Sequence, residues 1–195
     1  MSQDVLLSTL GTALLWLTLG GSLLALLFFF LPQPHPWGKG ALYLAASSAL
    51  LSSFLMEYLL LTDRFAFLYV AAHSSRATPF IYKAGALWGG QEGSLLFWLT
   101  LLLLFSSLLA RRVPREPAAQ RLWPRALGIL SGIGVFFALL LTVAAPPFTL
   151  LSSVPADGMG LNRLLRDPAM LLHPVALYSG FVGLSIPYAF AMAGL

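Results

Sequence analysis

Five long apolar blocks, separated by more polar connections, constrain the fold of this chain more than any other feature. The blocks cover about residues 5–31, 41–61, 93–110, 126–145 and 174–195. Each is long enough, or nearly so, to cross ~30 Å of hydrocarbon as an α-helix that rises about 1.5 Å per residue. Backbone N–H and C=O groups find no partners in lipid, so such blocks span as helices. We therefore predict an all-α, polytopic integral membrane protein with about five transmembrane helices.

The composition agrees with this class and excludes several others. Only 9% of the 195 residues are charged and 58% are hydrophobic, which is rare in water-soluble domains. The first block is too long for a signal peptide core and follows Asp4 with no basic residue. The absence of cysteine removes disulfides, Cys-ligated zinc, iron–sulfur clusters and thiol catalysis within this chain.

The basic residues predict which way the helices run. The connections 32–40 and 111–125 hold six Lys and Arg residues, whereas the much longer segments 1–4, 62–92 and 146–173 hold five. Cytoplasmic connections carry the excess of Lys and Arg. We therefore expect the N-terminus outside, together with the outer loops 62–92 and 146–173. The formal net charge of +4 is then a topological signal, and we expect no nucleic-acid partner.

One connection and the C-terminal residues indicate how the chain is organised. Residues 113–118 contain two prolines and are expected to form a short cytoplasmic turn. The chain stops at Met192-Ala-Gly-Leu195, at the end of an apolar run and without a polar tail. We expect residues 1–195 to be a single transmembrane region, the N-terminal part of a longer membrane protein.

The stretch Trp88-Gly-Gly-Gln-Glu-Gly-Ser-Leu-Leu-Phe-Trp98 stands at the entrance of the third block. It holds two indoles, three glycines and one carboxylate, a composition that spanning alone does not require. Consecutive glycines let backbone or a ligand approach closely. Glu92 is expected in the first helical turn, where the macrodipole favours a carboxylate. A structural and a functional role both stay open for Glu92, and for Glu57 near the outer end of the second block.

Loop 62–92 is rich in aromatic residues, namely Phe65, Phe67, Tyr69, Phe80, Tyr82 and Trp88. They are typical of an interfacial aromatic belt, and the alternative is a wall for a flat apolar ligand. Residues 65–70 have the composition of a strand. Pro79 to Lys83 is expected to begin a helix that lies on the surface.

The segment around His173 has the clearest chemical features. Asp167 followed by Pro168 predicts a helix start, with an N-cap acceptor and a proline at the first helical position. Pro174 lacks an N–H and disfavours helical geometry at His173, so we expect a break between a short turn over 168–172 and the fifth span. Within an arc of roughly 80°, His173 shares one side of the helix with a furrow of small residues. These are Ala176, Gly180, Gly183 and Pro187.

Histidine chemistry leaves two interpretations of His173. A neutral imidazole is a common metal ligand and a standard axial ligand of haem iron. The alternative is an interfacial histidine that only makes hydrogen bonds. Zinc is less favoured, because no second histidine or carboxylate stands at ligand spacing. His35, in a proline-rich turn, and His73, in the outer loop, are expected to be ordinary loop histidines.

Two motifs together resemble the CcmF-type cytochrome c haem lyase family of bacterial cytochrome c maturation. The family pattern Trp-Gly-x-x-Glu-Gly-Ser-Leu-Leu-x-Trp is matched from Trp88 to Trp98. A second pattern runs Asp-Gly-x-Gly-Leu-Asn, then Leu-Leu-x-Asp-Pro, then His-Pro-x-x-Leu-Tyr, and is matched from Asp157 to Tyr178. The resemblance covers the whole chain and corresponds to the N-terminal third of such a protein.

The resemblance implies a protein of the bacterial inner membrane that holds haem of the b type at its periplasmic face, as substrate and as a candidate bound cofactor. It implies thioether attachment of haem to the Cys-x-x-Cys-His segment of apocytochrome c. The implied partners are apocytochrome c, a haem chaperone, other maturation proteins and the lipid bilayer. By the same resemblance, His173 is an axial ligand of haem iron. Because the family's Trp-rich segment and second outer histidine lie further along, this segment alone is not expected to suffice for lyase activity.

A haem site needs an apolar wall, an iron ligand and cations at the rim. The expected haem-binding residues are therefore His173, Trp88, Glu92, Trp98, Arg163 and Arg166. Phe65 and Phe67 are expected to extend the wall. Arg163 and Arg166 depart from the family pattern, and their guanidinium groups suit the haem propionates. No catalytic residue is assigned, because the reactive sulfurs belong to the client.

Two other classes of function remain as alternatives. The first is a membrane subunit of a transporter or proton-translocating complex, which places ionisable groups near the bilayer midplane. Glu57 and Glu92 stand near the outer end instead, which counts against that class. The second is a structural partner that docks other assembly proteins.

Overall fold

The structure is a computed structural model that describes residues 2–31 and 36–195. Within these residues, five helices are long and apolar enough to cross a membrane. They are α1 (Ser2–Phe30), α2 (Trp37–Leu61), α5 (Gln91–Arg111), α6 (Pro117–Leu139) and α7 (Pro168–Ala193). Each overlaps one of the apolar blocks of the sequence. The prediction of an all-α, polytopic membrane protein is confirmed.

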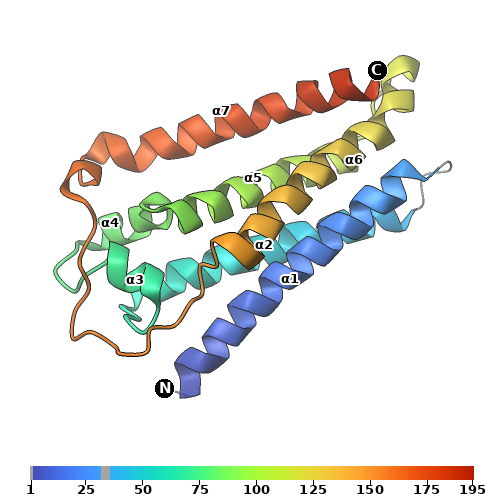
Figure 1. Ribbon diagram of the computed structural model, residues 1–195. Coiled ribbons are helices and arrows are strands. Elements are labelled where there is room, and N and C mark those ends of the chain that lie inside the picture. The colour runs from blue at the N-terminus through green and yellow to red at the C-terminus, as the bar shows by residue number, and fades with distance from the viewer. Residues whose placement is uncertain (1, 32–35) are drawn as a thin grey trace.

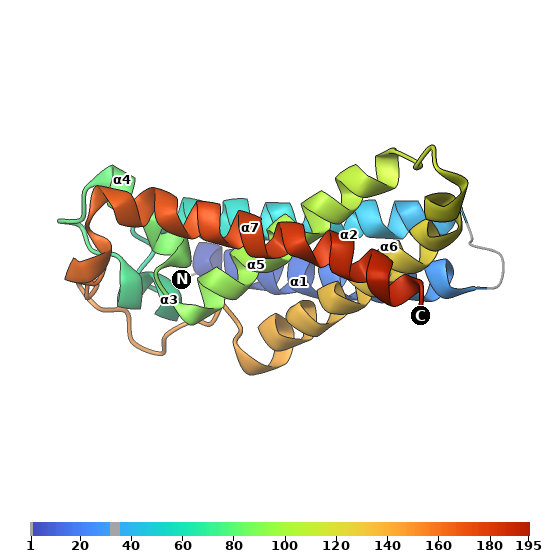
Figure 2. The same ribbon diagram turned by 90° about the horizontal axis from the view of Figure 1, so that it is seen from above.

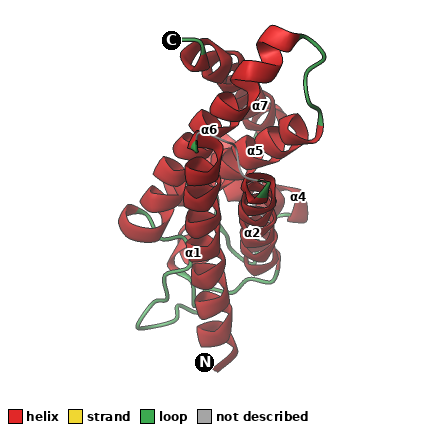
Figure 3. Cartoon of the chain, turned by 90° about the vertical axis from the view of Figure 1, so that its right-hand side faces the viewer, coloured by secondary structure: helices red, strands yellow, loops and turns green. Residues whose placement is uncertain are grey.

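Four of the long helices form a closed ring, and the fifth lies against its outside. Neighbouring contacts run from α1 to α2, from α2 to α5, from α5 to α6 and from α6 back to α1. Among the long helices, α7 packs mainly on α5 and α6, along one edge of the bundle (Figures 1 and 2). Seen along the bundle, α7 stands apart from the α1–α2 pair (Figure 3). Much of its surface therefore meets no other described part of the chain.

Helices α1 and α2 approach each other closely at Gly21. A Cβ added at Gly21 would lie 3.0 Å from the Ala41 carbonyl oxygen and 3.0 Å from the Ala45 nitrogen. Small residues let helix backbones approach in this way inside a membrane. A buried hydrogen bond of 2.8 Å between the Ser53 and Thr100 hydroxyls adds a polar contact between α2 and α5.

A cap, residues 62–90 and 145–167, covers one end of the bundle, beside the N-terminus (Figure 1). It contains the short helices α3 (Leu68–His73) and α4 (Phe80–Gly85) and the 3-10 turns η1 (Ala86–Trp88) and η3 (Arg163–Leu165). Helix α4 confirms the helix expected to begin near Pro79. The basic connection between α5 and α6 lies at the other end of the bundle.

Backbone hydrogen bonds join the two segments of the cap. The Leu68 N–H donates to the Thr149 carbonyl at 2.9 Å, and the Leu151 N–H donates to the Ala66 carbonyl at 2.8 Å. Phe67 and Leu150 form an isolated antiparallel bridge between these bonds. The strand predicted over 65–70 is therefore wrong, because pairing is limited to this bridge and the chain turns into α3 at Leu68.

Helix α7 runs through both of its prolines without a break. Asp167 accepts a hydrogen bond of 2.8 Å from the Ala169 N–H, and Pro168 occupies the first turn, which confirms the predicted helix start. The break predicted at His173 is wrong, because the helix continues through Pro174 to Ala193. A proline removes one backbone donor, and a long membrane helix tolerates that loss when the remaining turns are intact.

Helix α6 begins nine residues before its apolar block, at Pro117 rather than 126, and ends in a π-helical turn, η2 (Leu140–Ala144). Proline is favoured in a first helical turn because its missing N–H would have no helical partner there. The extra turns carry Arg121 and Arg125, which hydropathy alone assigned to a connection. The helix thus extends beyond the apolar part of the span.

Replacing Gly21 by leucine should destabilise the bundle, because the side chain would press on the backbone of α2. Overpacking of this kind costs about 1–3 kcal/mol. The matched control is Gly20→Leu, since an added Cβ there meets nothing within 4 Å. Thermal unfolding in detergent, followed by circular dichroism, should show a lower melting temperature for Gly21→Leu only. Equal melting temperatures for the two variants would contradict the close contact.

Candidate functional site

The glycine-rich stretch before α5 surrounds the buried side chain of Tyr69. The Tyr69 hydroxyl lies 2.9 Å from the carbonyl oxygens of Ala86 and of Leu87, and it accepts from the Gly90 N–H at 3.1 Å. Tyr69 is 3% exposed, so this hydroxyl has little access to water. Burial raises the pKa of the Tyr69 hydroxyl above its usual range, so it stays protonated. Helix α3 is thereby fixed to η1 and to the start of α5.

Two glycines of the motif leave the space that Tyr69 and His73 occupy. A Cβ at Gly93 would collide with the Leu87 carbonyl oxygen and the Tyr69 hydroxyl. A Cβ at Gly90 would collide with the imidazole of His73. The close approach expected at these glycines is present, and in this chain it is made by protein side chains and backbone.

His73 lies at the centre of this arrangement. Its ring stacks on the Tyr69 ring, with centroids 4.3 Å apart, and its Nδ1 is 2.9 Å from the Tyr69 carbonyl oxygen. A carbonyl oxygen only accepts, so Nδ1 carries the proton and Nε2 of the neutral ring keeps its lone pair. Nε2 is the atom nearest to the position of a Cβ on Gly90. His73 is therefore a positioned imidazole rather than an ordinary loop histidine.

Two neighbouring cavities share His73. The first has a volume of about 250 Å³, and its lining includes Tyr69, His73 and Glu92. Glu92 lies in the first turn of α5, as predicted. The second has a volume of about 540 Å³, and its lining includes His73, Gly89, Arg163 and Arg166. The structure thus brings three of the predicted site residues to the two sides of one histidine.

The second cavity is also where the two sequence motifs meet. A Cβ at Gly89 would lie 2.8 Å from Cδ1 of Leu161, which is itself buried. Arg166 donates from Nε to the Leu161 carbonyl at 3.0 Å, which holds its guanidinium beside the cavity. Arg163 is exposed, and no described residue is recorded as its side-chain partner. The site therefore has one anchored guanidinium and one that projects to solvent.

Asp157, from the start of the second motif, ties the cap loops together. Its carboxylate accepts from the N–H of Arg76 at 2.9 Å and from that of Gly158 at 2.8 Å. These bonds, the one from Arg76 first, hold the pKa of the Asp157 carboxyl below its usual range. A carboxyl with a lowered folded-state pKa stabilises the fold above its unfolded pKa and loses that effect as pH falls through the folded value. This contact is therefore intact at neutral pH and weakens in acid.

His173 lies apart from both cavities, on the exposed side of α7. The predicted furrow below it is open, since an added Cβ at Gly180 or Gly183 would meet nothing within 4 Å. On another side of α7, turned away from His173, the first turns of this helix and the cap enclose an apolar groove of about 440 Å³. Its lining includes Trp88 from η1 and Leu172 and Val175, which flank His173 in sequence. Trp88 therefore lies in a groove that the first turns of α7 also line, and His173 is not part of that lining.

Trp98 belongs to an aromatic cluster between α5, α6 and α7. Its ring centroid is 5.4 Å from that of Phe137, 5.4 Å from that of Tyr178 and 6.1 Å from that of Phe181. Aromatic pairs at such distances add to the packing of the helices that carry them. Through these contacts, Trp98 attaches α7 to helices α5 and α6 of the bundle.

Two predicted wall residues are not available to a ligand. Phe65 is 4% exposed and Phe67 is 0% exposed, because both form the core beneath the cap loops. The prediction that they line a haem wall is wrong, and the aromatic composition of the segment did not distinguish core from wall. His35 lies outside the described residues. Sequence reasoning also missed Tyr69 and His73 as a pair, because a six-residue helix carries no periodic pattern that reveals an i, i+4 contact.

Comparison with known proteins gives one consistent result. Residues 88–195 match the family described as cytochrome C assembly protein. The chain is 38% identical, over 87% of its length, to the cytochrome c-type biogenesis protein CcmF of Pseudomonas fluorescens, and it covers 24% of that protein. It is 35% identical, over 95% of its length, to CcmF of Escherichia coli K12, of which it covers 30%.

A solved structure agrees with these relatives. The cytochrome c heme lyase CcmF superposes with a TM-score of 0.73 at 33% identity, over 97% of this chain and 30% of that one. The chain therefore spans 24–30% of the length of these CcmF proteins.

Replacing Tyr69 by phenylalanine should loosen the cap without unfolding the bundle. The change leaves the Gly90 N–H and two carbonyls without their buried partner, a loss of about 1–3 kcal/mol. Hydrogen exchange should become faster in α3, η1 and the first turn of α5. Tyr82→Phe is the control, since the Tyr82 hydroxyl has no recorded partner among the described residues. Unchanged exchange in Tyr69→Phe would show that the hydroxyl does not hold the cap.

Proposed function

The chain belongs to the cytochrome c assembly protein family, as a CcmF-type member, and from this we propose that it acts in cytochrome c maturation by handling haem. The proposed reaction is the covalent attachment of haem to apocytochrome c. The proposal is carried by one observation, namely that the matched region holds an exposed histidine on the side of α7 that Gly180 and Gly183 leave open. In this proposal the chain presents haem for attachment, and it acts together with other polypeptide segments or proteins.

The proposed location is the bacterial inner membrane, with the cap in the periplasm. Five apolar helices and the CcmF relatives support a multi-pass membrane protein. The arginine-rich connection between α5 and α6 and the cap lie at opposite ends of the bundle (Figure 1). Because cytoplasmic connections carry the excess of basic residues, the cap and the N-terminus are assigned to the outside.

His173 is proposed as an axial ligand of haem iron. The imidazole of His173 is exposed on α7. It lies about 7.5 Å from Pro168 along the helix axis, since an α-helix rises about 1.5 Å per residue. An accessible, neutral imidazole can coordinate iron through a ring nitrogen. The open furrow at Gly180, on the same side of α7 as His173, lets the edge of the macrocycle approach, and the groove that contains Trp88 offers apolar surface on another side of the helix.

Arg163 and Arg166 are proposed to bind the haem propionates. Both line the cavity beside His73, and η3 ends at Leu165, shortly before α7 begins at Pro168. A guanidinium suits a carboxylate because it can donate two parallel hydrogen bonds. Glu92, on the opposite side of His73, is proposed to act through the shape of the site, since its carboxylate would repel a propionate.

The chemistry of attachment places few demands on the side chains of this chain. Each thioether forms when a client thiol adds across a haem vinyl group. A C–S bond and a C–H bond form, the S–H bond and the vinyl π bond are lost, and no oxidant is consumed. The contribution of the protein is to hold vinyl and thiol in attack geometry. The proposed partners are apocytochrome c, which supplies the thiols, a haem chaperone, and other maturation proteins.

The first test is haem retention. The protein purified from membranes should carry haem with a Soret absorbance, and His173→Ala should reduce that absorbance at least tenfold, because the iron loses its ligand. His35→Ala is the control, since it removes a histidine from the connection between α1 and α2. A Soret band of equal strength in His173→Ala would exclude His173 as the ligand.

The same assay tests the two arginines. Arg163→Gln and Arg166→Gln should each weaken haem retention severalfold, because a propionate loses a charged partner. Arg76→Gln is the control, because Arg76 is an exposed cap arginine outside the cavity lining. Unchanged haem content in both variants would exclude the propionate role and leave the role of His173 intact.

Sidedness can be measured in a natural cysteine-free background. Two variants each introduce one cysteine: Ser152→Cys in an exposed part of the cap, and Arg115→Cys in the basic connection between α5 and α6. A membrane-impermeant maleimide should label position 152 in intact spheroplasts and position 115 only after permeabilisation. The reverse pattern would place the cap in the cytoplasm and overturn the proposed haem location.

A further inference from the structure

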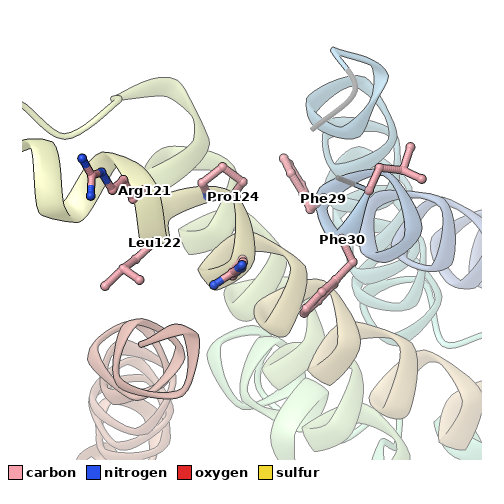
Figure 4. Close-up of a pocket in the computed structure, with 7 residues that line it drawn as sticks. Phe29, Phe30, Arg121, Leu122 and Pro124 are labelled. Atoms are coloured by element: carbon pink, nitrogen blue, oxygen red, sulfur yellow. The ribbon is translucent and has the colours of Figure 1, made fainter. Parts of the chain in front are cut away.

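A cavity of about 500 Å³ opens at the end of the bundle opposite the cap. Figure 4 shows Phe29 and Phe30 of α1 on one side and Arg121, Leu122 and Pro124 of α6 on the other. Arg125 completes the α6 side of the lining. The proposed haem chemistry uses none of these residues. The lining combines aromatic and aliphatic surface with two guanidinium groups.

The two arginines form a pair on one side of α6. Arg121 and Arg125 stand four residues apart, a spacing that places both on the same face of a helix. Both are exposed, and no carboxylate among residues 2–31 and 36–195 is recorded within ion-pair distance of either. Two positive charges therefore border the cavity without a counter-charge from the described chain.

Trp123, between the two arginines in sequence, indicates the depth of the cavity relative to the membrane. Trp123 is buried, donates from Nε1 to the Leu109 carbonyl at 3.3 Å, and has Lys39 Nζ 4.7 Å from its ring centroid. Tryptophan and basic residues concentrate where a span leaves the hydrocarbon. The apolar block of α6 begins directly after Arg125, at 126. The guanidinium groups therefore lie at headgroup level.

The apolar side of the cavity includes exposed aromatic surface. Phe30 is 52% exposed, and its ring packs where Gly128 leaves room, since a Cβ there would lie 2.5 Å from Phe30 Cε2. Leu122 lines the same cavity from α6. A ligand that fits must carry a negative charge at one end and apolar chains at the other.

We propose that this cavity binds one anionic phospholipid. Its phosphate accepts hydrogen bonds from Arg121 and Arg125, and its acyl chains lie against Phe30 and Leu122. Basic pockets between membrane helices at a cytoplasmic surface suit such headgroups, and arginine suits a phosphate. A soluble phosphate would satisfy the charges and leave the apolar surface uncovered, so the lipid is the better match to both halves of the lining.

The test measures lipid binding to the detergent-purified protein by native mass spectrometry. Phosphatidylglycerol should bind at least tenfold more tightly than phosphatidylcholine, and inorganic phosphate at millimolar concentration should not displace it. Arg121→Gln and Arg125→Gln should each weaken binding about fivefold. Arg115→Gln is the matched control, because Arg115 is exposed in the same basic region and does not line the cavity. Its affinity should stay within twofold of the natural protein.

Several outcomes would overturn the proposal. Equal binding of the two lipids would show that no charge is recognised, and displacement by phosphate would identify a site for a soluble anion. An equal loss in Arg115→Gln would show diffuse surface attraction, and no retained lipid would mean that protein fills the cavity. If a glutamine variant does not fold, the variant with Arg121→Lys and Arg125→Lys keeps both charges. It should still prefer phosphatidylglycerol, with reduced affinity, and no preference would refute the site.

Discussion

The hydroxyl of Tyr69 fixes α3 to η1 and to Gly90, the residue directly before α5, and so holds the cap together at the entrance of the bundle. A phenol in the core of the cap must find hydrogen-bond partners, because an unpartnered buried polar group is costly. The partners are two carbonyls of η1 and the N–H of Gly90 at the start of α5. The same ring supports the imidazole of His73. His73 lines both the cavity that contains Glu92 and the cavity that contains Arg163 and Arg166.

The architecture divides the work between a rigid ring and a peripheral helix. The ring of α1, α2, α5 and α6 closes on itself, and α7 shares a buried core with α5 and α6 on its outside. Helix α7 is attached through the Trp98 cluster and through the turns that border the Trp88 groove. This arrangement leaves His173 exposed while its helix is still fixed to the bundle. Exposure of that kind suits a residue whose ligand is delivered and later released.

The sequence was informative wherever one local rule decided the structure. Hydrocarbon allows only helices to span, so the apolar blocks predicted α1, α2, α5, α6 and α7. The N-cap at Asp167 and the place of Glu92 in the first turn of α5 followed from single residues and were confirmed. The break at Pro174 was wrong because one missing donor does not outweigh the surrounding turns.

Prediction was weaker where distant segments meet. The cap depends on contacts such as the one between Arg76 and Asp157, which are 81 residues apart, and no local pattern encodes them. For that reason Phe65 and Phe67 were assigned to a ligand wall although both are buried, and His73 was assigned to a loop. The two motifs were recognised separately, but their contact through Gly89 and Leu161 required the structure.

The packing at Gly90 and Gly93 changes how genetic data on this motif should be interpreted. Any side chain at position 93 meets the Leu87 carbonyl, and any at position 90 meets the imidazole of His73. A null phenotype from either substitution reports a misassembled scaffold, and it carries no information about reactive groups. Only residues whose truncation leaves that scaffold untouched, such as the solvent-facing imidazole on α7, can separate chemistry from architecture in a mutational screen.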